Sequence, residues 1–297
     1  QSLGLGGQGG PVIAGHEPCG VVAERGPGVS EGEAPIGQRV MNHHYKGCGR
    51  CKHCRVGWSQ LCRAGITVYG VTAHGGHAEY MKVPASTLVT LPEQLSFAEG
   101  AAVACGTGTA FSALKRMKVT GGDTLAVFGQ GPVGLSATLL GAAMGLRVIA
   151  IETNAERTRL AKEFGASDTI DASREDVVKS IHEMTKGEGA DFTLECSRPS
   201  AAPEAAVRSV KAWGTACYVG EGGDVKPNVS PDLLRRQVTL IGSWTFSAMG
   251  MAECAKFIDD NDIDLERIFS HRWKLEQADE AYRVFDKQST GKGVFLL

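Results

Sequence analysis

Four cysteines lie close together in the segment CGRCKHCRVGWSQLC, with the spacing C-x2-C-x2-C-x7-C. Four thiolates on one loop can complete a tetrahedral zinc site that has no open position, which is typical of structural zinc. An iron–sulfur cluster also takes four thiolates and is the alternative metal centre. We expect the histidines beside these cysteines to be exposed polar residues rather than ligands. The residues concerned are Cys48, Cys51, Cys54 and Cys62, with His43, His44 and His53.

A second motif is the glycine-rich turn in TLAVFGQGPVG, which has the pattern G-x-G-x-x-G at Gly129, Gly131 and Gly134. It follows a predicted strand and opens a predicted helix, which is the context in which this pattern binds a dinucleotide. The first glycine permits a tight turn, the second lets backbone N–H groups approach a pyrophosphate, and the third lets helix and strand pack closely. The phosphates then lie at a helix N-terminus, where the helix dipole favours an anion.

An acidic residue, Glu152, ends the next predicted strand, about twenty residues after the glycines. A carboxylate there can accept hydrogen bonds from the adenosine ribose and repel a 2′-phosphate, so NAD is predicted over NADP. Arg157 follows shortly afterwards and could instead contact a phosphate.

These motifs depend on elements that the hydrophobic pattern predicts. The N-terminal third shows short extended runs separated by Gly and Pro, at 21–24, 38–41 and 79–83. A long helical stretch with a Gly-Thr interruption covers 96–117. Apolar strands then alternate with helices, which indicates a parallel sheet covered on both faces. The strands are at 124–128, 147–151, 190–195, 215–219 and 238–242, with helices at 133–144, 155–164 and 251–260.

The composition excludes several classes of protein. The 297 residues carry a net charge of -2, with 42% hydrophobic residues and 39 glycines. This chain is too hydrophobic to be disordered, and it has no Gly-X-Y period of collagen. The small net charge gives no sign of a nucleic-acid surface, and no apolar run reaches the roughly 20 residues of a membrane span. An odd number of cysteines with one dense cluster indicates a reducing compartment, so we expect a cytoplasmic protein.

The order of five short motifs along the chain is itself informative. Gly-His-Glu at 15–17, the four-cysteine loop, GGHAEYMKVP, CGTGTAFSAL and the glycine turn occur in the order found in zinc-dependent medium-chain alcohol dehydrogenases, which the whole chain resembles. The resemblance implies an α/β fold, with a Rossmann-type doubly wound parallel sheet and a strand-rich GroES-like catalytic domain. The expected domains are 1–105 (catalytic, with the structural zinc lobe), 106–245 (NAD-binding) and 246–297 (returning to the catalytic domain).

The resemblance also implies site residues. His16 and Cys105 correspond to ligands of a catalytic zinc, and Glu17 to the carboxylate beside it, which either supports the ligands or exchanges with one. The residues that would line the NAD site are Thr109, Gly129, Gly131, Pro132, Val133, Gly134, Glu152, Arg157, Cys196, Val219, Gly220 and Ser243.

The implied activity is hydride transfer between a primary or secondary alcohol and NAD, giving an aldehyde or ketone, in an enzyme with a structural and a catalytic Zn²⁺. The expected partners are a small-molecule alcohol or carbonyl substrate and identical chains in a homodimer or homotetramer, with no nucleic acid and no membrane. A polyol or amino-alcohol dehydrogenase of the sorbitol or threonine type is one alternative.

One departure from the family leaves a second alternative. The family's N-terminal segment carries a further cysteine ligand, and no Cys, His, Asp or Glu precedes His16 here. We expect the natural protein to be longer. A non-catalytic dinucleotide-binding protein would follow if that ligand were truly absent.

Overall fold

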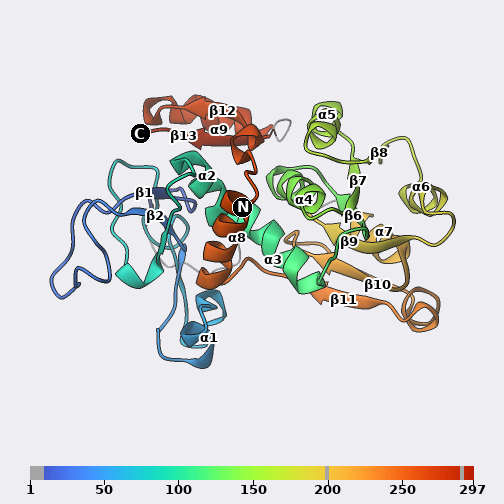
Figure 1. The fold of residues 1–297 in the computed structure, drawn as a ribbon, viewed down its shortest axis with the longest axis horizontal. Coiled ribbons are helices and arrows are strands. Elements are labelled where there is room, and N and C mark those ends of the chain that lie inside the picture. The colour runs from blue at the N-terminus through green and yellow to red at the C-terminus, as the bar shows by residue number, and fades with distance from the viewer. Residues whose placement is uncertain (1–9, 198–200, 288–290) are drawn as a thin grey trace.

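The computed structural model describes residues 10–197, 201–287 and 291–297 (Figure 1). Its largest sheet has six parallel strands in the order β11-β10-β9-β6-β7-β8. Strand β6 is the first of these strands along the chain and lies inside the sheet. The later strands are added on one side of it (β7, β8) and then on the other (β9, β10, β11), so the sheet is doubly wound and the predicted fold class is confirmed. The strands are β6 (Thr124–Phe128), β7 (Arg147–Glu152), β8 (Asp168–Asp171), β9 (Ala190–Glu195), β10 (Val210–Tyr218) and β11 (Thr239–Gly242).

Both faces of this sheet are buried, as the uninterrupted apolar strands predicted. Successive side chains of β6 point to opposite faces, so Leu125 and Val127 join one hydrophobic cluster while Ala126 and Phe128 join another. The first cluster also takes residues from α3 (Gly108–Met117), α4 and α8 (Ala248–Asp260), and the second from α6 and α7. The helices around the sheet are α4 (Pro132–Ala143), α5 (Ala155–Glu163), α6 (Val177–Met184) and α7 (Ala202–Ser209).

The N-terminal part is built from short antiparallel strands. One sheet has the order β1-β2-β5, and β3 pairs with β4. The run at 79–83, predicted to be extended, forms no strand because no described strand pairs with it. The elements are β1 (Cys19–Val21), β2 (Arg39–Asn42), β3 (Tyr45–Lys46), α1 (Lys52–Arg55), β4 (Thr67–Val68) and β5 (Leu88–Thr90).

The long helical stretch is present, and its interruption has a defined geometry. Helix α2 (Phe97–Ala102) begins with a capping box, in which the Ser96 hydroxyl accepts from Glu99 N–H and the Glu99 carboxylate accepts from Ser96 N–H. A π-helical turn at Val103–Thr107 then leads into α3 (Gly108–Met117). Such turns are frequently found at functional sites, and this one carries Cys105.

The C-terminal segment returns to the N-terminal strands (Figure 1). It contains α8 (Ala248–Asp260), β12 (Phe269–Trp273), α9 (Ala278–Asp286) and β13 (Lys292–Phe295). The contact is direct, because the Tyr282 hydroxyl lies 2.9 Å from His77 Nδ1 and the Phe295 ring is 4.8 Å from the His77 ring. No helix among the described residues has the length and apolar character needed to cross a membrane.

Candidate functional site

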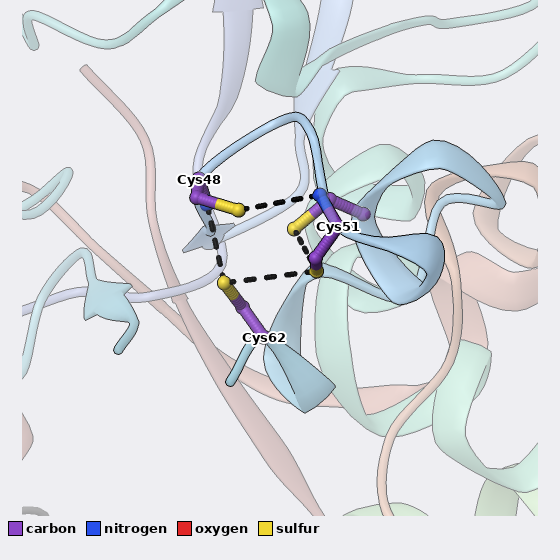
Figure 2. A group of neighbouring side chains, drawn as sticks. Cys48, Cys51 and Cys62 are labelled. Atoms are coloured by element: carbon purple, nitrogen blue, oxygen red, sulfur yellow. Dashed lines mark hydrogen bonds between the residues drawn. The ribbon is translucent and has the colours of Figure 1, made fainter. Parts of the chain in front are cut away.

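The four clustered cysteines converge on one point, and Figure 2 shows the Cys48, Cys51 and Cys62 thiols turned toward one another. With Cys54 included, the four sulfur atoms all lie within 4.8 Å of one another. Cys51 Sγ is 3.5 Å from Cys54 Sγ and 4.0 Å from Cys62 Sγ. A tetrahedral ion with Zn–S bonds of about 2.3 Å places its sulfurs about 3.8 Å apart, so this spacing fits a single zinc ion. A multi-iron cluster would need room for several metal and sulfide ions between the thiolates and fits less well.

Backbone N–H groups point at two of these sulfur atoms, those of Cys48 and Cys62, whereas burial raises the pKa of the Cys54 thiol to about 11. Cys48 N–H donates to Cys62 Sγ at 3.3 Å, and Cys51 N–H donates to Cys48 Sγ at 3.4 Å. The N–H groups of Arg50 and Cys51 lower the pKa of the Cys48 thiol to about 6. This favours the thiolate, which is the form that binds zinc.

A second group of metal donors is assembled from distant parts of the chain. The His16 imidazole, a Glu17 carboxylate oxygen and the Cys105 sulfur lie within 4.8 Å of one another. His16 and Glu17 precede β1, while Cys105 lies in the π-helical turn after α2. One nitrogen, one oxygen and one sulfur donor form a set that zinc accepts, and three protein donors leave a position open, as catalytic zinc requires.

A buried lysine stands behind this group. Lys292 Nζ donates to Glu17 Oε2, and the N–H of Gly106 also bonds this carboxylate. Burial alone would raise the pKa of Glu17, but the charges of Lys292 and His16 and these hydrogen bonds hold it below its ordinary value. Burial, followed by the nearby Glu17 charge, raises the pKa of the Cys105 thiol. Glu17 is therefore held as a carboxylate, while Cys105 keeps its proton until a cation replaces it.

The three glycines of the turn after β6 occupy three different environments. Gly129 has φ +85°, and a Cβ there would lie 2.6 Å from Ser197 Cβ, so only glycine fits. A Cβ at Gly134 would collide with the Gly129 carbonyl oxygen, which explains the close packing of α4 on the turn. Gly131 faces open space and caps α4 without any side-chain hydrogen bond. The first N–H groups of α4 are therefore accessible from this side, as a pyrophosphate would need.

Glu152 is fixed beside this turn. Its Oε2 accepts from Gln130 N–H at 2.7 Å, and its Oε1 accepts from Thr153 N–H at 2.8 Å and Asn154 N–H at 3.1 Å. Asn154 then caps α5 by accepting from the N–H of Arg157 at 3.1 Å. The carboxylate at the end of β7 and the glycine turn after β6 thus form one hydrogen-bonded unit.

The remaining residues predicted to contact the cofactor lie around the carboxyl edge of the sheet. Pro132 and Val133 open α4, and Thr109 lies in the first turn of α3. In open parallel sheets a ligand binds at this edge, where the strand order reverses, which here is between β6 and β9. The residues that directly follow β9, β10 and β11 are Cys196, Val219, Gly220 and Ser243.

Comparisons with known proteins agree with this geometry. The family model of the alcohol dehydrogenase GroES-like domain matches residues 4–93, and that of the zinc-binding dehydrogenase matches residues 132–260. A zinc-type alcohol dehydrogenase-like protein of Escherichia coli K12 is 39% identical over 285 residues, which cover 95% of this chain and 80% of that protein. This chain belongs to the zinc-dependent medium-chain dehydrogenase family.

Solved structures of similar proteins share the dehydrogenase fold. The alcohol dehydrogenase TADH from Thermus sp. ATN1 has a TM-score of 0.87 at 28% identity, covering 96% of this chain and 85% of that one. A zinc-binding dehydrogenase from Sinorhizobium meliloti 1021, bound to NADP, has a TM-score of 0.84 at 29% identity, covering 98% of this chain and 83% of that one. The predicted family is therefore confirmed, and its members support zinc and a nicotinamide dinucleotide as cofactors.

The dehydrogenase site also contains residues that the sequence did not single out. Lys292 lies 275 residues from Glu17, and no spacing rule connects them.

The prediction that His43 and His44 are exposed is wrong, because each is only 1% exposed. His43 Nε2 lies 3.1 Å from the Phe246 carbonyl oxygen, so the segment before α8 covers this part of the chain. Burial lowers the pKa of both imidazoles, which are therefore neutral at pH 7.

Proposed function

We propose that this dehydrogenase transfers a hydride between a primary or secondary alcohol and NAD, giving an aldehyde or ketone. The observation that carries the proposal is the contact between the metal-donor turn and the cofactor helix. Thr107 Oγ1 lies 2.9 Å from Ser136 Oγ of α4, and a Cβ at Gly106 would lie 3.9 Å from Val133 Cγ2. The turn that presents Cys105 therefore packs on the first turns of the helix that would hold the pyrophosphate.

In the proposed site, His16, Cys105 and Glu17 would hold the catalytic zinc, and the four-cysteine loop would hold the structural zinc. Zinc supplies Lewis acidity toward an alcohol oxygen, and NAD accepts the hydride. The protein's contribution is positioning. Lys292 and Gly106 N–H hold the Glu17 carboxylate in place. The glycine turn and α4 would receive the pyrophosphate.

We propose NAD rather than NADP as the cofactor. Three backbone N–H groups hold the Glu152 carboxylate beside the glycine turn, where it would accept from ribose hydroxyls and repel a 2′-phosphate. A similar structure is bound to NADP, so NADP is the alternative cofactor, and Arg157 would then contact its 2′-phosphate.

The test is NAD- and NADP-dependent oxidation of a panel of primary and secondary alcohols, followed at the nicotinamide absorbance. Failure to reduce either cofactor with any alcohol would refute the proposed activity.

Metal content separates the enzyme from a non-catalytic dinucleotide-binding protein. Two zinc ions per chain by elemental analysis are expected for the enzyme, and one for the binding protein.

Because of the likeness to its family, we also propose that the protein forms a homodimer or homotetramer, which light scattering tests. We further propose domains at 1–105, 106–245 and 246–297, of which residues 1–9, 198–200 and 288–290 lie outside the described part. A cytoplasmic location is proposed because none of the nine cysteines, all of which lie in the described part, forms a disulfide.

A further inference from the structure

The segment around the four-cysteine site, residues 46–63, carries cationic side chains and no acidic one, and forms a basic lobe. The whole stretch between Glu33 and Glu79 contains no aspartate or glutamate. All of the cationic side chains of the lobe are exposed, and none forms an ion pair with a residue in the described ranges 10–197, 201–287 and 291–297. They outnumber the formal charge of about −2 on a zinc ion bound by four thiolates, so the lobe stays positive when zinc is bound. They are Lys46, Arg50, Lys52, Arg55 and Arg63.

Negative charge gathers at the far end of the helix that starts beside this lobe. The N–H of Ala248, the first residue of α8, donates to the Gly57 carbonyl oxygen at 3.0 Å, and Figure 1 shows α1 next to this end of α8. The other end of α8 lies about 18 Å away, because an α-helix rises about 1.5 Å per residue. It leads into the sequence Asp-Asp-Asn-Asp-Ile-Asp at 259–264, the acidic run.

Neither charged region stabilises the chain that carries it. The C-terminal end of a helix is the negative end of its dipole and favours cations, but the last turn of α8 has no basic residue and the acidic run follows it. Asp262 and Asp264 are exposed and make no ion pair within the part of the chain that the structure describes. Like charges also repel one another within the basic lobe and within the acidic run. Contact between the two regions would relieve both.

The face of α8 that joins the two charged regions is open and self-complementary. Met249, Glu253, Lys256 and Asp260 are exposed and follow at intervals of three or four residues, so they share one face of the helix. The Glu253 and Lys256 side chains are 51% and 73% exposed. When two such faces pack antiparallel about a twofold axis between positions 253 and 256, Glu253 of each copy faces Lys256 of the other. Each acidic run then reaches the basic lobe of the other copy and the N-terminus of its α8, where the helix dipole favours acids.

We propose that a second copy of this chain docks on the exposed face of α8, with the acidic run of each copy against the basic lobe of the other. Both copies use the same surface, so the contact closes as a twofold pair and does not continue into a filament. The central residues Glu253 and Lys256 already have partners in their own chain, so the two ends of the interface supply most of the attraction. The inference gives the proposed homo-oligomer a surface and does not depend on hydride transfer.

The test is the mass of the zinc-loaded full chain by sedimentation equilibrium in about 0.05 M salt, where surface charges are weakly screened. Lys52→Glu/Arg55→Glu removes the positive charge of the basic lobe, and Asp262→Lys/Asp264→Lys removes the negative charge of the acidic run. Each variant alone loses the attraction at both ends of the interface and should sediment at half the wild-type mass. An equal mixture of the two should return to the wild-type mass, because one end then has wild-type charges on both sides and the other has both sides altered.

The matched control is Lys162→Glu, an exposed charge reversal on α5 that should leave the mass unchanged. Raising the salt to about 1 M should halve the wild-type mass, since the charges are then screened within about 3 Å. If Lys52→Glu/Arg55→Glu loses zinc or melts early, Lys46→Glu/Arg63→Glu alters the same lobe outside the four-cysteine segment.

Three results would overturn the inference. They are a monomeric wild type at low salt, variants that each keep the wild-type mass, and a mixture that stays at half that mass. In the last case the loss would have a cause other than complementary charge. Alcohol oxidation by the zinc-loaded wild type is measured separately, so failure of the interface and failure of the proposed function are distinguished.

Discussion

The ion pair between Lys292 and Glu17 allows a quantitative test of how the candidate metal site is held. In Lys292→Met the chain keeps its length but Glu17 loses its cation. The two side chains are 9% and 23% exposed, so the pair is largely out of water. Removing one partner of a buried pair costs about 3–5 kcal/mol, because the other charge is left uncompensated. Glu17 keeps the Gly106 N–H and some solvent contact, so we expect a loss of about 2–3 kcal/mol in the free energy of unfolding.

The loss of unfolding free energy in Lys292→Met should become smaller as the pH falls, because the ion pair requires an ionised Glu17. In the wild type the pKa of Glu17 lies below its ordinary value of 4.5, so the pair's stabilisation is complete above that value and is lost as pH falls through the folded-state pKa. In Lys292→Met the remaining burial raises this pKa, so the folded variant gains stability as Glu17 protonates. The difference between the two proteins should therefore be largest near pH 8 and shrink toward about pH 4.

The assay is urea unfolding of both proteins at several pH values, after chelation so that a bound metal does not set the ionisation of Glu17. Lys287→Met is the matched control, because Lys287 is exposed at the end of α9 and should change stability by less than about 0.5 kcal/mol. Equal losses in the two variants, or a Lys292→Met loss that stays constant from pH 8 to 4, would refute the reasoning.

Three further predictions concern the two metal groups and the cofactor turn. Cys51→Ser should remove one zinc per chain by elemental analysis and lower the melting temperature; unchanged zinc content would count against a four-thiolate site. Cys105→Ala should abolish alcohol oxidation while the NADH dissociation constant, measured by fluorescence, stays within about twofold, so a large loss of NADH binding would contradict separate metal and cofactor sites. Glu152→Ala should lower the NAD-to-NADP ratio of kcat/KM by about tenfold or more, whereas a wild-type preference for NADP would show that this carboxylate does not select the cofactor.

The parallel sheet illustrates where prediction from sequence succeeded. The strands β6, β7 and β9 were predicted within a residue, because a strand buried on both faces is a continuous apolar run that needs no knowledge of its neighbours. Strand β8, with the sequence Asp-Thr-Ile-Asp, was missed because its own residues carry little hydrophobic signal. It forms because the exposed edge of β7 accepts it, with Ile149 opposite Asp168 and Ile151 opposite Ile170. Its existence is a property of the sheet rather than of the segment.

The candidate metal and cofactor residues divide in the same way. Local spacing was sufficient for the four-cysteine loop and the glycine turn, because each is a short segment whose residues must meet whatever the rest of the chain does. The approach of His16 and Glu17 to Cys105 could be expected only by resemblance, since some ninety residues of chain separate them.

What the sequence by itself determined is therefore the set of local chemical motifs, the apolar strands and, through motif order, the family. Only the tertiary structure decided that Lys292 pairs with Glu17, that His43 and His44 are buried, and that Nδ1 of His44 has no hydrogen-bond partner among the residues that the structure describes. The physical reason is that spacing along the chain sets which groups can meet within a loop or a single helix or strand. Burial, ion pairing and hydrogen-bond satisfaction between distant segments depend on how the folded elements pack.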